Sequence, residues 1–97
     1  MIKECKSIAE VRENIDSIDR KIVKLISERS EFVEQAAKFK KDTEDVKAPK
    51  RVEAVIEKFR NIAYENDVNP DIVEEVYCTM ISCFIKQELV DHAKINI

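Results

Sequence analysis

The stretch that decides the fold is SIAEVRENIDSIDRKIVKL, which runs from Ser7 to Leu25. It opens with Ser7-Ile8-Ala9-Glu10, a capping box whose serine and glutamate side chains bond to backbone N–H groups at a helix start. Apolar residues then recur at steps of three and four, the period of one helix face: Ile8, Val11, Ile15, Ile18, Ile22 and Leu25. The sequence therefore predicts a first helix with its N-cap at Ser7 and its end at about Lys41.

The middle of the chain carries the signals for a loop and a second helix. The run Asp42-Thr43-Glu44-Asp45 is polar and a weak helix former, so a loop is expected there and through Lys47. Pro49 suits the first turn of a helix, because the N–H that proline lacks has no helical partner at that position. We expect this second helix to span residues 49–65 and to end at Asn66-Asp67.

The segment Asn69-Pro70-Asp71 predicts the start of a third helix. It supplies an N-cap, a proline at the first helical position and an acid in the first turn. This helix is expected to run to about His92. The chain contains no glycine and shows no alternating strand pattern, which argues against β-hairpins and glycine-rich phosphate loops. The predicted fold is therefore all-α, with three helices in a single domain that spans residues 1–97.

The length of the first helix predicts assembly. About 35 residues at a rise of ~1.5 Å make it roughly 50 Å long, whereas a compact chain of this size has a radius of gyration of only about 13 Å. One chain cannot cover such a helix, and its apolar seam suits a second helix. We therefore expect an intertwined homodimer.

Composition narrows the classes of partner and compartment. The net charge of −3, from 17 basic and 20 acidic residues, argues against nucleic acid as the main partner. No apolar run approaches the ~18 residues of a membrane span, and no signal peptide precedes the first helix. Three cysteines cannot all pair within one chain, so reduced thiols in the cytoplasm are expected, with Cys78 and Cys83 among the core residues of the third helix. Without a C-x-x-C motif and with one histidine, no metal or other cofactor is expected.

Cations interrupt a second row on the first helix that should face the core. The row has the same three-and-four spacing: Arg12, Ile15, Asp19, Ile22, Ile26, Arg29, Val33, Ala36 and Lys40. Ionised groups near a core are unfavourable unless opposite charges meet them. Taken singly, each long side chain is also consistent with an ordinary flank position from which its charge reaches water.

Two further charged residues favour a binding site over ordinary flank positions for these cations. Arg51 lies in the first turn of the second helix, and Glu88 lies on the apolar row of the third helix formed by Tyr77, Met80 or Ile81, and Phe84. Together with the three cations of the first helix, they suggest a small, enclosed, cationic pocket. Its ligand would be an anion that carries more than one carboxylate.

The spacing of the cations along the first helix indicates that one pocket takes its cations from two subunits. Arg29 and Lys40 are 11 positions apart, roughly 16 Å along the axis, so both can reach one small ligand. Arg12 lies 17 positions from Arg29, roughly 25 Å away, which is too far within one chain. In an antiparallel dimer the partner's Arg12 can take its place. Two pockets, each completed by the other subunit, are then expected.

These residues resemble a known family. Val11-Arg12-Glu13-Asn14-Ile15-Asp16-Ser17-Ile18-Asp19, followed by Arg29 and Lys40 at these spacings, is similar to the all-helical chorismate mutases, and the resemblance covers about Ile8 to Leu89. Within that family the chain looks closest to the isochorismate-pyruvate lyase branch. The residues that show this resemblance are Phe39-Lys40, Ala48-Pro49-Lys50-Arg51-Val52 and the segment Ile81 to Leu89.

The resemblance implies an intertwined dimer that binds chorismate or isochorismate. By position, the partner's Arg12 together with Arg29 would hold the two substrate carboxylates through bidentate pairing. Lys40 would donate to the ether oxygen of the enolpyruvyl group, and Arg51 would add positive potential near a carboxylate. The family's reaction is pericyclic, so it requires neither a nucleophile nor a metal.

The sequence departs from the family pattern at two places. Many members have a glutamine where Glu88 falls, so Glu88 can donate to the ether oxygen only when protonated, which burial favours. If the register slips by one, Gln87 is the donor instead. Typical mutases also place an acid at the position of Val52 and often at that of Ala48, where it meets the ring hydroxyl of the substrate. The lyase branch lacks this acceptor too.

Three functions follow from these observations. The first is chorismate mutase activity, and the second is isochorismate-pyruvate lyase activity, which releases pyruvate and leaves salicylate; a mutase for an amino-substituted chorismate is a related variant. The third, from a different class, is a non-catalytic helical dimerisation module whose cations pair with Asp19 or Glu88. The sequence leaves open the pathway served, any partner enzyme, and whether residues 42–48 close over a ligand.

Overall fold

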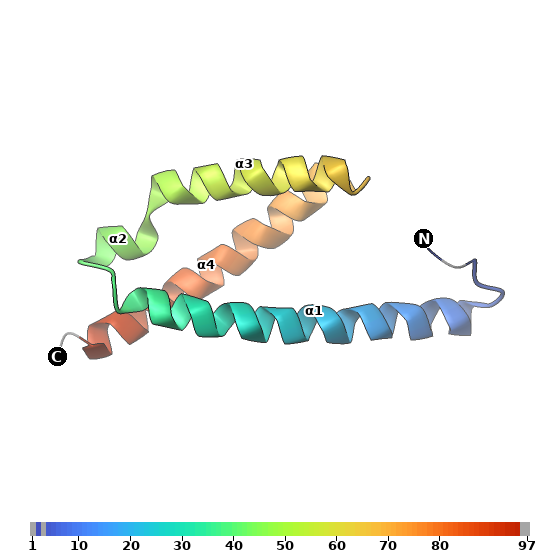
Figure 1. The fold of residues 1–97 in the computed structure, drawn as a ribbon, viewed down its shortest axis with the longest axis horizontal. Helices are drawn as coiled ribbons and strands as arrows, with labels where there is room; N and C mark the ends of the chain where they lie inside the picture. The colour runs from blue at the N-terminus through green and yellow to red at the C-terminus, as the bar shows by residue number, and fades with distance from the viewer. Residues whose placement is uncertain (1, 3, 96–97) are drawn as a thin grey trace. The chain divides into compact units, whose positions relative to one another are not determined.

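The computed structural model describes residue 2 and residues 4–95, and it confirms the all-α class. The helices are α1 (Ile8–Ala37), α2 (Thr43–Lys47), α3 (Pro49–Glu65) and α4 (Pro70–Ile95), and the described residues contain no strand (Figure 1). None of these helices combines the length and the apolar character needed to cross a membrane. The chain forms two compact units, one up to Phe32 and one from Val33 onward.

Helix α1 begins where the capping box predicts. The hydroxyl of Ser7 accepts a hydrogen bond from the N–H of Glu10 at 3.1 Å. The Glu10 carboxylate in turn accepts from the N–H of Lys6 at 3.2 Å, one residue before the position that the motif specifies. Both ends of the box are therefore formed by contacts within five residues.

The predicted end of this helix at about Lys41 is wrong, because α1 ends at Ala37. The next N–H groups, those of Lys38, Phe39 and Lys40, bond to carbonyls three residues back, which tightens the chain into a turn. The N–H of Lys41 then donates to the carboxylate of Asp45 at 2.9 Å instead of to a helix carbonyl. Because Lys40 lies outside the helix, its predicted axial distance from Arg29 does not apply.

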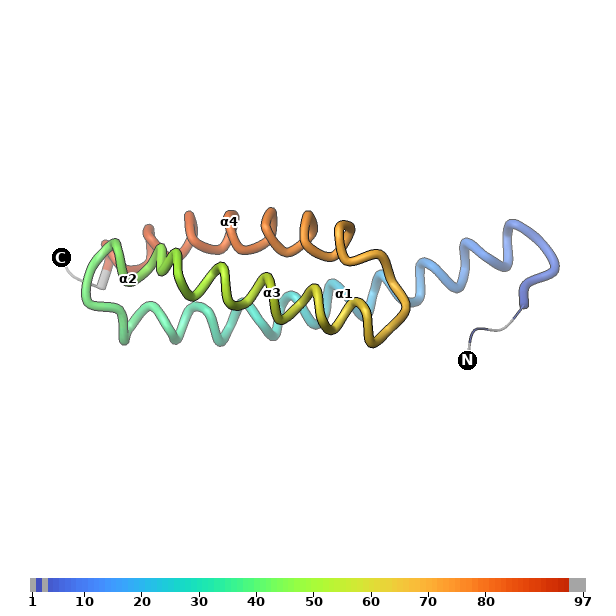
Figure 2. The backbone as a smooth tube through the Cα atoms, turned by 90° about the horizontal axis from the view of Figure 1, so that it is seen from above, coloured from blue at the N-terminus to red at the C-terminus, as the bar shows by residue number. Residues whose placement is uncertain are grey.

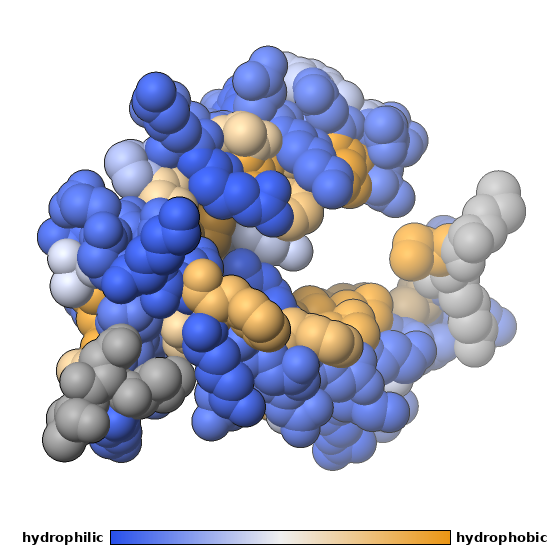
Figure 3. All heavy atoms as spheres, turned by 60° about the vertical axis from the view of Figure 1, so that its left-hand side comes forward, coloured by the Kyte–Doolittle hydropathy of each residue, from blue (hydrophilic) through white to orange (hydrophobic). Residues whose placement is uncertain are grey.

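The first unit leaves its apolar seam uncovered. Every residue from 11 to 28 is exposed, including Ile15 (49%), Ile18 (48%) and Leu25 (60%). Figure 3 shows an orange apolar stripe along α1 bordered by blue polar side chains. The row predicted to face a core is therefore exposed from Arg12 to Ile26 in the single chain, whereas Arg29, Val33 and Ala36 of that row are partly buried.

The loop predicted at residues 42–47 is wrong, because Thr43–Lys47 form helix α2. The Asp42 carboxylate accepts from the N–H of Asp45 at 2.9 Å and so caps the helix, and acids in its first turn suit the helix dipole. Val46 is 2% exposed. Capping and burial together outweigh the low helix propensity of this segment.

Helix α2 is separated from α3 by one strained residue. Ala48 has φ 37° and ψ 60°, a left-handed conformation in which a Cβ costs about 1–2 kcal/mol. Its N–H donates to the carbonyl of Glu44 at 2.8 Å, and its carbonyl accepts from Val52 at 3.0 Å. Ala48 thus ends one helix and begins the next, with Pro49 at the first helical position as predicted.

Helices α3 and α4 form an antiparallel hairpin that gives the second unit its core (Figures 1 and 2). Helix α3 ends at Glu65 as predicted, in a Schellman motif: the N–H of Val68 bonds to Ala63 and that of Asp67 to Tyr64, with Asp67 at φ 56°. Ala63, at 2% exposure, lies under this turn.

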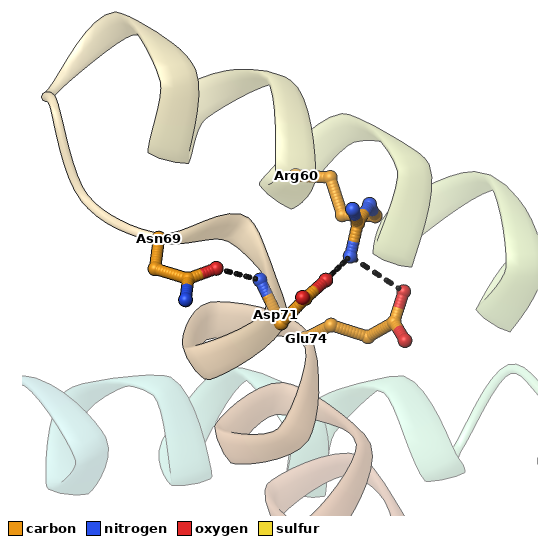
Figure 4. A network of polar contacts seen from close by, with 4 residues as sticks. All are labelled: Arg60, Asn69, Asp71 and Glu74. Carbon is orange, nitrogen blue, oxygen red and sulfur yellow. Dashed lines mark hydrogen bonds and ion pairs between the residues drawn. The ribbon is translucent and has the colours of Figure 1, made fainter.

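The hairpin is joined by polar contacts, which Figure 4 shows, and by an aromatic contact. The Asn69 side chain caps α4 by accepting from the N–H of Asp71 at 2.9 Å, as predicted. From α3, Nη1 of Arg60 bonds to Asp71 at 2.9 Å and to Glu74 at 3.3 Å. The rings of Phe59 and Tyr77 stack with centroids 4.0 Å apart.

Helix α4 continues to Ile95, three residues beyond the predicted His92. Of its predicted buried row, Ile81 and Glu88 are buried, and Tyr77, Met80 and Phe84 are partly buried. The expectation that Cys78 and Cys83 belong to the core is wrong, because both are exposed in the single chain.

Candidate functional site

Lys40 lies just after α1 and is held by both neighbouring elements of the second unit. Its ammonium Nζ donates to the main-chain carbonyl of Asp45 in α2 at 3.2 Å. Its own main-chain carbonyl lies 2.8 Å from Nε2 of His92 in α4. Although it is a lysine, its side chain is partly buried. These contacts place a cation at the junction of α2 and α4.

Glu88 occupies the adjoining part of α4. It is only 6% exposed, and burial raises the pKa of its carboxyl because the interior solvates the charged form poorly. The positive charge of Lys40 and that of His92 act in the opposite direction, and Asp91 adds to the increase. Glu88 therefore lies close enough to Lys40 for the two charges to interact, although 48 positions separate them in the sequence.

The structure also separates Glu88 from its neighbour. Gln87 is exposed, and its amide donates to the Asp91 carboxylate at 3.1 Å. The interior face of α4 thus carries the glutamate and not the glutamine, as the apolar row of the sequence indicates.

The remaining cations are distributed over both units. Arg51 is exposed in the first turn of α3. Arg12 and Arg29 belong to the first unit, where one continuous helix keeps them roughly 25 Å apart along its axis. Arg12 is exposed, whereas Arg29 is partly buried and its Nη1 is shielded from solvent. Of the five predicted residues, Lys40, Arg51 and Glu88 belong to the second unit, where Glu88 lies within range of the charge of Lys40.

The positions that lack an acid flank the first turn of α3. Ala48 and Val52 are both partly buried and are linked by the hydrogen bond that begins the helix. Neither side chain accepts a hydrogen bond from a hydroxyl group. Any ligand that reaches this turn therefore meets an apolar surface there.

His92 is the residue that sequence analysis missed. It is 8% exposed and contacts the main chain of Lys40, yet nothing was assigned to it from the sequence. The available signal is its position four residues after Glu88, which places both on one face of the helix. Among the described residues, no three cysteine, histidine, aspartate or glutamate side chains gather as a metal site requires.

Chemically, Lys40 and Glu88 are two groups able to donate hydrogen bonds. The ammonium is a donor, and the carboxyl donates while it is protonated. Donors that point at an oxygen where negative charge develops stabilise a transition state more than a ground state.

Comparison with known proteins identifies relatives over most of the chain. Residues 11–89 match the family model described as chorismate mutase type II, a segment that contains all five predicted site residues. An isochorismate pyruvate lyase of Pseudomonas aeruginosa is 31% identical over 87 residues, which cover 90% of this chain and 86% of the relative. A chorismate mutase of Methanocaldococcus jannaschii is 30% identical over 77 residues, 78% of each chain.

Proposed function

The chain belongs to the chorismate mutase type II family, and we propose that it converts chorismate to prephenate in a cationic pocket shared between two subunits. The observation that carries this proposal is the burial of Glu88, within range of the charge of Lys40, in the segment that the family model covers. Both side chains would donate to the ether oxygen of the substrate.

The reaction moves electrons around a six-membered ring within one molecule. The C–O bond of the ether breaks as a new C–C bond forms, and no proton or nucleophile takes part. The enzyme contributes by holding the flexible substrate in a chair-like conformer. It also stabilises the negative charge that grows on the ether oxygen, through Lys40 and protonated Glu88.

Three arginines would hold the carboxylates. Arg29 and the partner's Arg12 pair with them in the two-pronged geometry that guanidinium groups favour. Arg51, at the start of α3, adds positive potential beside one carboxylate. The separation of Arg12 and Arg29 along α1 supports contribution from two subunits, since one small ligand cannot bridge roughly 25 Å.

We propose an intertwined homodimer as the functional form. The support is the exposed seam of α1, together with Ile72, Val76 and Val90 on α4, which are 57%, 55% and 49% exposed. Exposed apolar surface of this extent marks an interaction site. Each chain is expected to act as a single domain over residues 1–97, in the cytoplasm, where its thiols stay reduced.

A second function, isochorismate-pyruvate lyase activity, is favoured by Ala48 and Val52. Isochorismate carries its hydroxyl elsewhere on the ring, so it does not need an acceptor at this turn. The same arginines would hold isochorismate while a hydrogen atom moves from the ring to the enolpyruvyl group, which releases pyruvate and leaves salicylate. The similarity to a lyase over 90% of the chain supports this candidate.

A product assay with each substrate separately distinguishes these functions. With chorismate at pH 5, prephenate is expected, and it should form more slowly at pH 8. Salicylate and pyruvate from isochorismate, with little prephenate from chorismate, would make the protein a lyase. No product from either substrate, and no rise in melting temperature with a dicarboxylate transition-state mimic, would favour a dimerisation module.

Glu88→Gln is expected to flatten the pH dependence of turnover. Because burial raises the pKa of Glu88, the carboxyl keeps its proton to higher pH than an ordinary glutamate, but above that pKa wild-type kcat should fall about tenfold per pH unit. The amide donates at every pH. The measurement is kcat from pH 5 to 8, and equal slopes for both proteins would contradict the role of Glu88.

Glu88→Gln should also change how the melting temperature depends on pH. A carboxyl whose folded pKa is raised stabilises the fold fully below its unfolded pKa, and this contribution is lost as pH rises through the folded value. Glu88→Gln should therefore melt higher than wild type at pH 8, with a smaller advantage at pH 4. Glu75→Gln, an exposed change on the same helix, is the control and should leave both profiles unchanged.

A further inference from the structure

His92 is a buried histidine that the proposed mechanism does not use. It lies in the last turns of α4 and is 8% exposed. Its Nε2 meets the carbonyl of Lys40 at 2.8 Å, across 52 positions of sequence. A carbonyl oxygen has no proton to give, so Nε2 must carry the hydrogen and donate it.

The turn that carries Lys40 has few other restraints on that side. Helix α1 has ended at Ala37, and residues 38–42 are not helical. On the α2 side, Asp45 holds both the Lys40 ammonium and the N–H of Lys41. On the α4 side, His92 bonds to the Lys40 main chain.

Two residues of helix α4 thus lie near Lys40, Glu88 near its charge and His92 at its main chain. Glu88 and His92 are four residues apart on one helix face, a rise of about 6 Å. The first interacts with the charge at the tip of the lysine, and the second holds the carbonyl at its base. An extended lysine side chain spans a similar length, so the bond from His92 to the Lys40 carbonyl is compatible with an ammonium at the level of Glu88 along α4.

We propose that His92 is a positioning residue for the reaction, which fixes the Lys40 main chain so that the ammonium stays at the level of Glu88. This role rests on the proposed function. Loss of the His92 bond frees the 38–42 turn without removing any group that touches the substrate. Small displacements of a catalytic group reduce turnover steeply, because the reacting geometry is lost.

The central test compares His92→Leu with His92→Gln. Leucine fills a similar space but removes the donor, whereas glutamine keeps an N–H near the place of Nε2. His92→Leu is expected to lower kcat about 10- to 100-fold with little change in KM, since the arginines that hold the substrate carboxylates are unchanged. His92→Gln should retain kcat within about threefold of wild type. Lys94→Leu, an exposed change on the same helix, should have no effect.

A double variant separates positioning from general damage. If His92 acts through Lys40, then His92→Leu should cause no further loss of kcat in a Lys40→Met background. Additive losses would overturn the proposal, as would wild-type kcat for His92→Leu.

A second measurement does not depend on variants that fold. His92 is the only histidine in the chain, so its ring nitrogen signals in a ¹⁵N-labelled wild-type sample need no assignment. In the neutral imidazole the Nε2–H tautomer is expected, and an Nδ1–H tautomer would overturn the proposal. Wild-type inactivity on both substrates would instead overturn the proposed function, so the two failures are distinguishable.

Discussion

Lys40→Met should reduce kcat for the rearrangement by about 10²–10³-fold, the usual effect of removing one donor from a developing oxyanion. Methionine keeps the length and apolar body of lysine but cannot donate or carry charge. KM should change much less, because the carboxylates are held by arginines. The measurement is steady-state kinetics with chorismate, and with isochorismate if that is the substrate.

Lys41→Met is the matched control for this variant. Lys41 is the next residue and is exposed, and its main-chain N–H, which bonds to Asp45, survives the change of side chain. It removes the same charge from nearly the same place in the fold. Equal losses for the two variants would mean that net positive charge, and not a donor at Lys40, supports the reaction.

Arg12→Ala and Arg29→Ala should each abolish most activity alone and restore it when mixed. Losing one member of a buried guanidinium–carboxylate pair costs about 2–5 kcal/mol, roughly 30- to 5,000-fold in kcat/KM. In a heterodimer of the two variants, one pocket lacks both arginines and the other has both. Because random exchange makes half of the dimers mixed, about a quarter of wild-type activity should return.

The mixing experiment requires that subunits exchange. The two variants are unfolded together and refolded at equal concentrations, and a mixture of separately refolded proteins is the control. No recovery after joint refolding, with wild type recovering fully under the same protocol, would place both arginines of each site on one chain. Light scattering on the wild type measures the dimer independently.

Helix starts could be predicted because their causes are local. The Ser7 capping box, Pro49 at the first position of α3 and the Asn69 cap of α4 each depend on bonds within a few residues. The register of Glu88 on the buried face was predictable for the same reason, since helical periodicity decides which side of α4 it shares with Ile81.

The errors lie between residues 37 and 47, where side-chain capping by nearby aspartates and the burial of Val46 outweigh residue propensity. Helix α1 stops at Ala37 because Asp45 takes the N–H of Lys41, and α2 forms because its cap and the burial of Val46 compensate for a weak helix former. The exposure of α1 in the single chain agrees with the expectation that one chain cannot cover a helix of this length.

The sequence by itself determined the all-α class, the family and the five charged residues of the proposed site, because residue type and helical spacing carry that information. Only the tertiary structure decided which of them meet. His92 meets the main chain of Lys40, and Glu88 lies within range of the lysine's charge, because α4 folds back along α3 and packs against α2. Helical spacing places Glu88 on the buried face, and packing against the rest of the second unit buries it and raises the pKa of its carboxyl.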